Sequence, residues 1–192
     1  MPIASGKSSP ARAPGTIDLV GPLSLPRLAF LIMLGAMTVL LHDSFNLPLK
    51  MPGHHGLETM FLLVIGRLSC TNPWSATIVA LSAVTTAGFT SPGMGIHGGL
   101  LLLAPGFVLD LAVRILPNWR AQMFVLPLLA ATAFAMKPLI RLLFSKTMGL
   151  QYGSIQNGVM YPLSTHFLFG LTGAAIAVIV WRTTARRMRQ QP

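Results

Sequence analysis

Residues 28–41 read LAFLIMLGAMTVLL, and this uncharged apolar stretch decides the class of fold. The apolar run that contains it extends from residue 25 to residue 41. A helix that spans a bilayer needs about 20 apolar residues, with a range of roughly 17–25. The run is followed by HDSFN and carries no A-x-A cleavage signature, so we expect a retained membrane helix instead of a signal peptide.

The composition places the whole chain in the same class. Its 192 residues are 53% hydrophobic and 9% charged, with a mean hydropathy of +0.66, whereas soluble domains carry about 25% charged residues. Fourteen Lys and Arg against four acidic residues give a formal net charge of +10. These charges stand singly at the ends of apolar runs or in two short tails, which is the pattern that sets membrane topology. We find no nucleic-acid-binding module and expect the lipid bilayer to be the chain's surroundings.

Five further apolar runs follow the first one, at about residues 57–70, 72–89, 98–116, 122–144 and 161–181. The sequence therefore predicts an all-α fold, an integral membrane bundle of about six transmembrane helices over residues 25–181. Residues 1–24 are rich in Pro, Gly, Ser and Ala and are expected to form a flexible basic tail. Residues 182–192 are expected to form a basic cytoplasmic tail, and no second domain is expected.

The positive charges predict the orientation of the bundle in a bacterial cytoplasmic (inner) membrane. If both termini are cytoplasmic, the inner side collects ten basic residues: Lys7, Arg12, Arg27, Arg67, Arg114, Arg120, Arg182, Arg186, Arg187 and Arg189. The outer side then keeps four, namely Lys50, Lys137, Arg141 and Lys146. Positive charges favour the cytoplasmic side, so we predict that both termini are cytoplasmic. All five histidines then fall at or near the outer face.

The outer segment MPGHHGLE, residues 51–58, is the leading candidate for a binding site. Gly53 and Gly56 bracket two histidines and permit backbone conformations that other residues resist. Ionisable groups at the membrane boundary are functional candidates by default, and a few convergent polar groups in an apolar pocket are typical of a small-molecule site. We predict that the substrate-binding residues are His54, His55, Glu58, His97, Asn157, Tyr161 and His166.

The like-charged residues Lys137 and Arg141 are four apart and need an acidic partner. Glu58 is the expected protein partner, and an anionic group of a substrate is the alternative. Asp110 and Arg114 are also four apart, so we expect them to share a helix face and to neutralise each other near the inner boundary. We further expect this pair to support folding and not ligand selection.

The layout of the runs resembles the substrate-binding membrane subunit (S component) of energy-coupling-factor (ECF) vitamin and metal importers. The resemblance covers residues 28–116: LAFLIMLGAMTVLL, an outer loop with Pro and Gly (LPLKMPGHHG), a short helix ending in LLVIGRL, a small-residue helix (WSATIVALSAVTTAGF) and LLLAPGFVLDLAVRIL. The last stretch is similar to the family's Pro-Gly turn followed by an aspartate in the fourth helix. The resemblance implies a nutrient-capture subunit that works with a transmembrane coupling subunit and ATPases.

The family's Ala-x-x-x-Ala element is absent from the first apolar run, where Ala29 is followed four residues later by Met33. Pairs with the same spacing occur instead in the third run, and we predict a partner interface there, formed by Ala76, Ala80, Ala83 and Ala87. Small residues at this spacing permit close approach of helices. Packing within the bundle itself is the alternative explanation.

Catalytic chemistry is not indicated by any motif. The segment MPGHHGLE does not match H-E-x-x-H, and the chain has no P-loop, no Rossmann fingerprint and no CxxC pair. Its one cysteine, Cys70, is expected to be a small packed hydrophobe. We therefore predict no enzyme activity, no catalytic residue and no cofactor, and we assign no residue as a metal ligand. Three functions remain open: substrate capture for an importer, a structural or assembly role in a membrane complex, and metal handling through the histidines.

Overall fold

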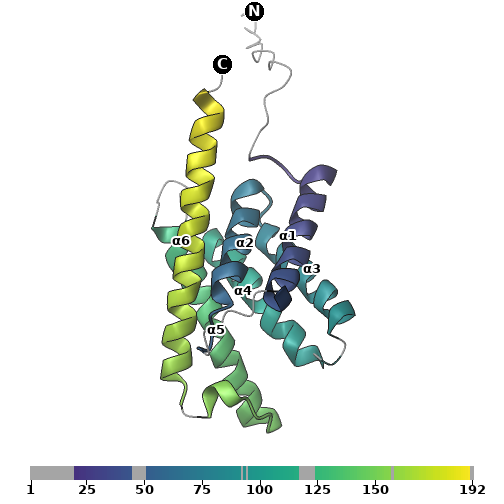
Figure 1. Cartoon of the computed structure of the whole chain (residues 1–192), viewed down its shortest axis with the longest axis vertical. Coiled ribbons are helices and arrows are strands. Elements are labelled where there is room, and N and C mark those ends of the chain that lie inside the picture. The colour runs from purple at the N-terminus through teal and green to yellow at the C-terminus, as the bar shows by residue number, and fades with distance from the viewer. Residues whose placement is uncertain are drawn as a thin grey trace, which may run out of the picture.

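The computed structural model describes residues 20–44, 51–91, 93, 95–116, 124–156 and 158–190. Over these residues the chain is helical and contains no strand (Figure 1). In chain order its elements are α1 (Leu25–Ser44), α2 (Gly56–Ser69), α3 (Ser75–Thr90), α4 (Gly95–Ile115), α5 (Val125–Met148), the short 3-10 helix η2 (Gly153–Ile155) and α6 (Met160–Gln190). The predicted all-α class is confirmed.

Four of these helices are long and apolar enough to cross a membrane, which is consistent with a multi-pass membrane protein. These candidate spans are Leu25–His42, Gly95–Ile115, Val125–Met148 and Met160–Met188. The other two helices, α2 and α3, have 14 and 16 residues, which corresponds to about 21 and 24 Å at 1.5 Å per residue. The hydrocarbon core is about 30 Å thick, so length and composition support four of the six predicted spans.

The helix α2 runs antiparallel to α1 along most of its length. At one end, Gly21 before α1 pairs with Cys70 after α2, and the Thr71 N–H donates to the Gly21 carbonyl over 2.9 Å. At the other end, His42 of α1 lies 3.8 Å from Glu58 of α2, measured from Nδ1 to Oε1. The two helices therefore traverse the same part of the bundle in opposite directions.

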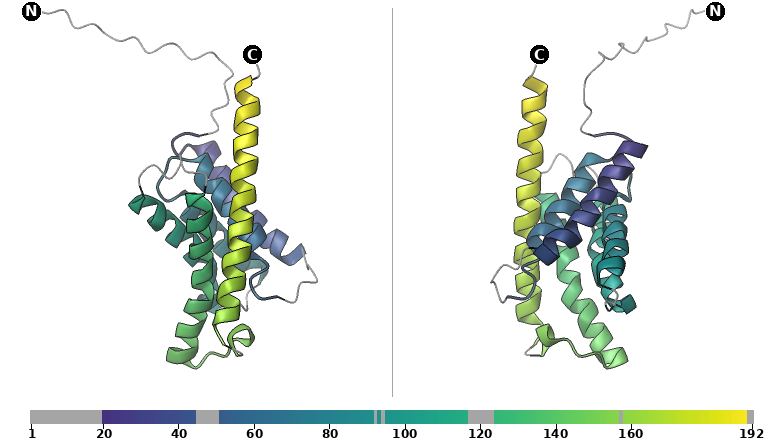
Figure 2. Two further views of the ribbon diagram at one scale, coloured as in Figure 1. Left: turned by 90° about the vertical axis from the view of Figure 1, so that its left-hand side faces the viewer. Right: turned by 45° about the vertical axis from the view of Figure 1, so that its right-hand side comes forward.

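The last helix, α6, is the longest and extends well past the rest of the bundle (Figures 1 and 2). Its 31 residues correspond to about 46 Å. The helix continues to Gln190, so most of the segment expected to be a tail is helical. Its C-terminal end projects on the same side as the start of α1 (Figure 2). The expected N-terminal tail lies outside the described residues except for its last few positions.

The core is built around α2, which packs on α1, α3, α5 and α6. Its apolar side chains Met60, Leu63 and Val64 are fully buried there. Glycines permit the closest contact, because a Cβ on Gly173 of α6 would collide with the carbonyl oxygen of Leu57. This helix is thus enclosed by protein, which explains why its sequence need not match the length or polarity of a lipid-facing span.

The four alanines predicted to form a partner interface are buried inside the bundle. Their side chains are at most 4% exposed. Two of them face α4, where a Cβ on Gly106 would lie 2.6 Å from the carbonyl oxygen of Ala76 and 2.7 Å from the Cβ of Ala80. The other two, Ala83 and Ala87, form a second apolar cluster with Val39 of α1. The alanines thus bring α3 close to its neighbours, which supports the alternative of packing within the bundle, and the partner interface stays a prediction.

The Pro-Gly pair of α4 does not form a turn. Pro105 and Gly106 lie inside an unbroken helix, and both are buried. Because Gly106 has no side chain, α3 can pack directly against the α4 backbone at this level. The resemblance to a family turn at this position is therefore not supported by the local conformation.

Candidate functional site

The segment MPGHHGLE forms a compact turn that leads into α2. The Gly56 N–H donates to the Gly53 carbonyl over 2.8 Å, and the Leu57 N–H donates to the His54 carbonyl over 3.2 Å. Gly53 has φ +88°, and a Cβ there would lie 2.7 Å from Nδ1 of His166 on α6. Conformation and space both require glycine at this position, so the turn is pressed against the last helix.

Three side chains from two helices and this turn converge at one point. The Nδ1–H of His55 donates to Oε1 of Glu58 over 2.7 Å, and Nδ1 of His42 lies 3.8 Å from the same oxygen. The rings of His42 and His55 are 3.7 Å apart between centroids. One ligand atom from each of the three residues lies within 4.8 Å of the others. We call these residues the His–Glu cluster.

His54 flanks the His–Glu cluster. Its ring centroid is 3.9 Å from that of His55. Its Nδ1 lies 2.7 Å from the Met51 carbonyl oxygen, and since a carbonyl oxygen only accepts, this nitrogen carries the proton. The remaining ring nitrogen of His54, Nε2, is then an acceptor.

The cluster passes from the surface into the bundle. The side chain of His42 is 50% exposed, that of His55 is 27% exposed and that of Glu58 is 11% exposed. On α5, the side chain of Lys137 is buried, and the charges of Arg141 and Glu58 both act on its ammonium group. Its Nζ lies 4.5 Å from the ring centroid of Phe134. Glu58 acts on Lys137 through its charge, and no direct ion pair joins these two described side chains, so the pairing expected from the sequence stays a prediction.

The other predicted binding residues occupy different surroundings. His166 is buried below Gly53, donates from Nδ1 to the Pro162 carbonyl over 2.7 Å and stacks on Phe134. His97 on α4 makes its ring contact with Tyr152, at 6.4 Å between centroids. Tyr161 is 57% exposed at the start of α6, and Asn157 lies outside the described residues. The structure thus brings His54, His55 and Glu58 together, places His166 against Gly53 of the same turn, and does not add His97 or Tyr161 to them.

His42 belongs to the cluster although it is not among the predicted binding residues. It ends the first candidate span, and the antiparallel course of α1 and α2 places the end of α1 beside the start of α2. A signal was available in the sequence, because consecutive helices are usually adjacent in space, which favours contact between the polar end of the first apolar run and the polar start of the second.

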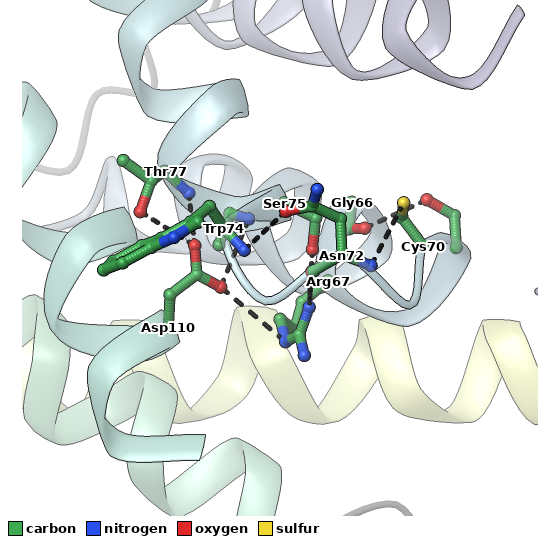
Figure 3. Close-up of polar contacts among 10 residues, drawn as sticks. Gly66, Arg67, Cys70, Asn72, Trp74, Ser75, Thr77 and Asp110 are labelled. Atoms are coloured by element: carbon green, nitrogen blue, oxygen red, sulfur yellow. Dashed lines mark hydrogen bonds and ion pairs between the residues drawn. The ribbon is translucent and has the colours of Figure 1, made fainter. Parts of the chain in front are cut away.

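A second polar cluster lies where α2 ends and α3 begins (Figure 3). Asp110 of α4 accepts hydrogen bonds from the Thr77 N–H over 2.7 Å, the Thr77 hydroxyl over 2.8 Å and the Ala76 N–H over 3.3 Å. The carboxylate therefore caps the N-terminal turn of α3, where backbone N–H groups lack helical partners. Figure 3 shows the Arg67 guanidinium directed at this carboxylate.

The predicted pair of Asp110 and Arg114 is wrong. Asp110 instead pairs with Arg67 of α2, at 3.6 Å from Oδ1 to Nε. Arg67 also donates to the Ser75 hydroxyl over 2.7 Å and to the Asn72 carbonyl. The Arg114 guanidinium lies 3.8 Å from the ring centroid of Trp74. The spacing of four residues within α4 identifies side chains on the same helix face. It gives no information about a cation on another helix, such as Arg67 on α2.

Two hollows lie away from these clusters. One, of about 500 Å³, is an apolar groove between α5 and α6, lined by residues that include Met136, Leu139 and Phe167. The other, of about 420 Å³, lies around Tyr152 and the end of α5. Neither is lined by a member of the His–Glu cluster.

Comparisons with protein families, curated proteins and solved structures find no match for this chain.

Proposed function

We propose that this protein is the substrate-capture subunit of an importer in a bacterial inner membrane. It binds a small nutrient at the MPGHHGLE turn. One observation carries the proposal. His42, His55 and Glu58 come from separate segments and converge beside a turn that is held against the last helix by Gly53. Convergent polar groups at the end of an apolar bundle are the usual form of a small-molecule site.

The membrane arrangement follows from the same proposal. We infer that α2 and α3 cross the bilayer within the shelter of the longer helices, which gives six crossings and places both termini in the cytoplasm. The antiparallel contacts of α2 with α1 support this inference, since α2 then traverses the same depth as an apolar span. The basic residues at the C-terminal end of α6 favour a cytoplasmic location for that end.

Energy for import would come from a transmembrane coupling subunit and ATPases, as in ECF-type importers. The alternative role as an assembly subunit rested on the small-residue face of α3. That face is buried by packing within the chain. No specific observation therefore favours a role in assembling a larger complex.

The test is to identify a bound compound. Protein purified from its native membrane is denatured, and the released small molecules are identified by mass spectrometry. The compound found should raise the thermal stability of the intact protein, and His55→Ala should reduce this stabilisation. Thr85→Ala, at an exposed position on α3, is the matched control and should keep it. If no compound is released and no candidate nutrient stabilises the protein, capture is the wrong function.

A further inference from the structure

We infer that His42, His55 and Glu58 form a binding site for one divalent transition-metal ion. The inference names the ligand of the site described above and so rests on the proposed function. Its basis is the approach of three potential ligand atoms to within 4.8 Å of one another. Imidazole and carboxylate together suit zinc, nickel, cobalt and copper.

The spacing of the ligand atoms fits a small coordination sphere. Bond lengths of about 2.0–2.2 Å to nitrogen or oxygen in a tetrahedral site place neighbouring ligand atoms about 3.3–3.6 Å apart. His42 Nδ1 and Glu58 Oε1 are 3.8 Å apart, close to this range. His55 Nδ1 and Glu58 Oε1 are 2.7 Å apart because they share a proton, and a bound ion would replace that proton. Modest rotation of these side chains therefore completes three sides of a site.

The fourth position has a candidate ligand in His54. The hydrogen bond from its Nδ1 to the Met51 carbonyl fixes the tautomer with Nε2 as acceptor. This arrangement is typical of metal-binding histidines, whose second nitrogen donates to a carbonyl or carboxylate. With the centroid of the His54 ring already 3.9 Å from that of His55, a change in side-chain rotamer or a water molecule would close the coordination sphere.

Exposure and charge suit capture and release more than permanent storage. Because the side chain of His42 is half exposed, an ion can reach the site from the surface of the bundle. Glu58 is the acidic member of the His–Glu cluster, and its charge also interacts with the ammonium group of the buried Lys137. A cation in the cluster is attracted by Glu58 and repelled by Lys137, so the site does not provide the charge compensation of a closed structural site.

The experiment uses the full chain with an affinity tag that contains no histidine, purified in lipid nanodiscs and stripped with a chelator. Zn²⁺ or Co²⁺ is then added, the metal per chain is measured by mass spectrometry, and the visible spectrum of Co²⁺ reports tetrahedral nitrogen and oxygen ligation. We expect one ion per chain. His42→Ala and His55→Ala should each weaken binding by at least about tenfold, and Glu58→Gln should do the same.

The matched control is His97→Ala, which removes a histidine that contacts Tyr152 instead of the cluster and should bind metal as the wild type does. If Glu58→Gln fails to fold, the half-exposed His42 still decides the question. Absence of a stoichiometric ion, or equal binding by all variants, overturns the metal site. A bound organic nutrient without metal would refute the metal site and leave capture standing. Metal binding in a protein that takes part in no uptake would refute the capture function and leave the metal site standing.

Discussion

Asp110 of α4 and Arg67 of α2 pair across the bundle, with 3.6 Å between Oδ1 and Nε. The same carboxylate caps α3 through the backbone of Ala76 and Thr77. One acidic side chain therefore connects three helices at the level where two of them end or begin. Both side chains are nearly inaccessible, at 0% exposure for Asp110 and 5% for Arg67, so neither charge has water as a substitute partner.

Asp110→Ala should destabilise the bundle by about 3 kcal/mol, because removing one member of a buried ion pair leaves the other charge uncompensated. Thermal unfolding can be followed with a thiol-reactive dye, since Cys70 is buried and becomes reactive only when the bundle opens. The double variant Asp110→Ala with Arg67→Leu should recover part of the loss. Arg114→Ala is the control and should cost less than about 1 kcal/mol, as for an exposed cation–π contact. An equal loss for Arg114→Ala would mean that the pairing within α4 matters after all.

Gly106→Ala and Gly88→Ala should change stability in opposite directions. Alanine is favoured over glycine within a helix by roughly 0.5–1 kcal/mol, and a Cβ at Gly88 meets no atom within 4 Å. At Gly106 the new Cβ would lie 2.6 Å from a backbone oxygen of α3, so the two helices must separate. The same dye assay should show a higher melting temperature for Gly88→Ala and a lower one for Gly106→Ala. Similar behaviour of the two variants would argue against the close contact of α3 and α4.

The sequence predicted the helices well and their partners poorly. The apolar run at residues 57–70 corresponds to the helix Gly56–Ser69, and the run at 161–181 starts one residue after the first residue of α6. Runs of apolar residues reveal helices because each helix must bury or immerse its side chains. They do not reveal which helix contacts which, so the pairing of Arg67 with Asp110, 43 positions apart, was missed.

The candidate site was predicted in part for the same reason. The glycines around the two histidines indicated a turn with a backbone conformation that other residues resist, and in the structure this turn packs against α6. His42 was missed because its place in the cluster depends on the antiparallel course of α1 and α2. His97 was included because it falls on the same side of the predicted topology, but sidedness does not fix distance within a face.

Lys137→Met should strengthen metal binding at the His–Glu cluster by on the order of tenfold, because it removes a positive charge that acts on Glu58. The same change should weaken the binding of a ligand that presents an anionic group there. Isothermal titration of the nanodisc-embedded protein with Zn²⁺ measures the first effect directly. The charge-preserving variant Lys137→Arg is the control for loss of packing. A fall in Zn²⁺ affinity for Lys137→Met alone would show that the lysine supports the site instead of opposing the cation.

A membrane-impermeant maleimide should label Gly153→Cys in intact cells and should not label Ser24→Cys. Both variants are made in a Cys70→Ala background, and a Cβ at Gly153 meets no atom within 4 Å. Residue 153 lies in the connection at the start of α6, whereas residue 24 directly precedes α1 at the opposite end of the bundle (Figure 1). Permeabilised cells provide the control that both cysteines react. Labelling of residue 24 alone would invert the proposed orientation.

The enclosure of α2 has a consequence for how the chain is made. A short helix with an internal arginine and glutamate partitions weakly into lipid on its own, and much of its surface is covered by α6. The glycines at positions 56 and 173 that allow this contact are separated by more than half the chain. Because α6 follows the other helices in the chain, the second helix reaches its final surroundings only after α6 has been synthesised. Until then it depends on α1, α3 or an insertion factor to shield its polar groups, and a chain cut short before α6 leaves the centre of the bundle without one of its walls.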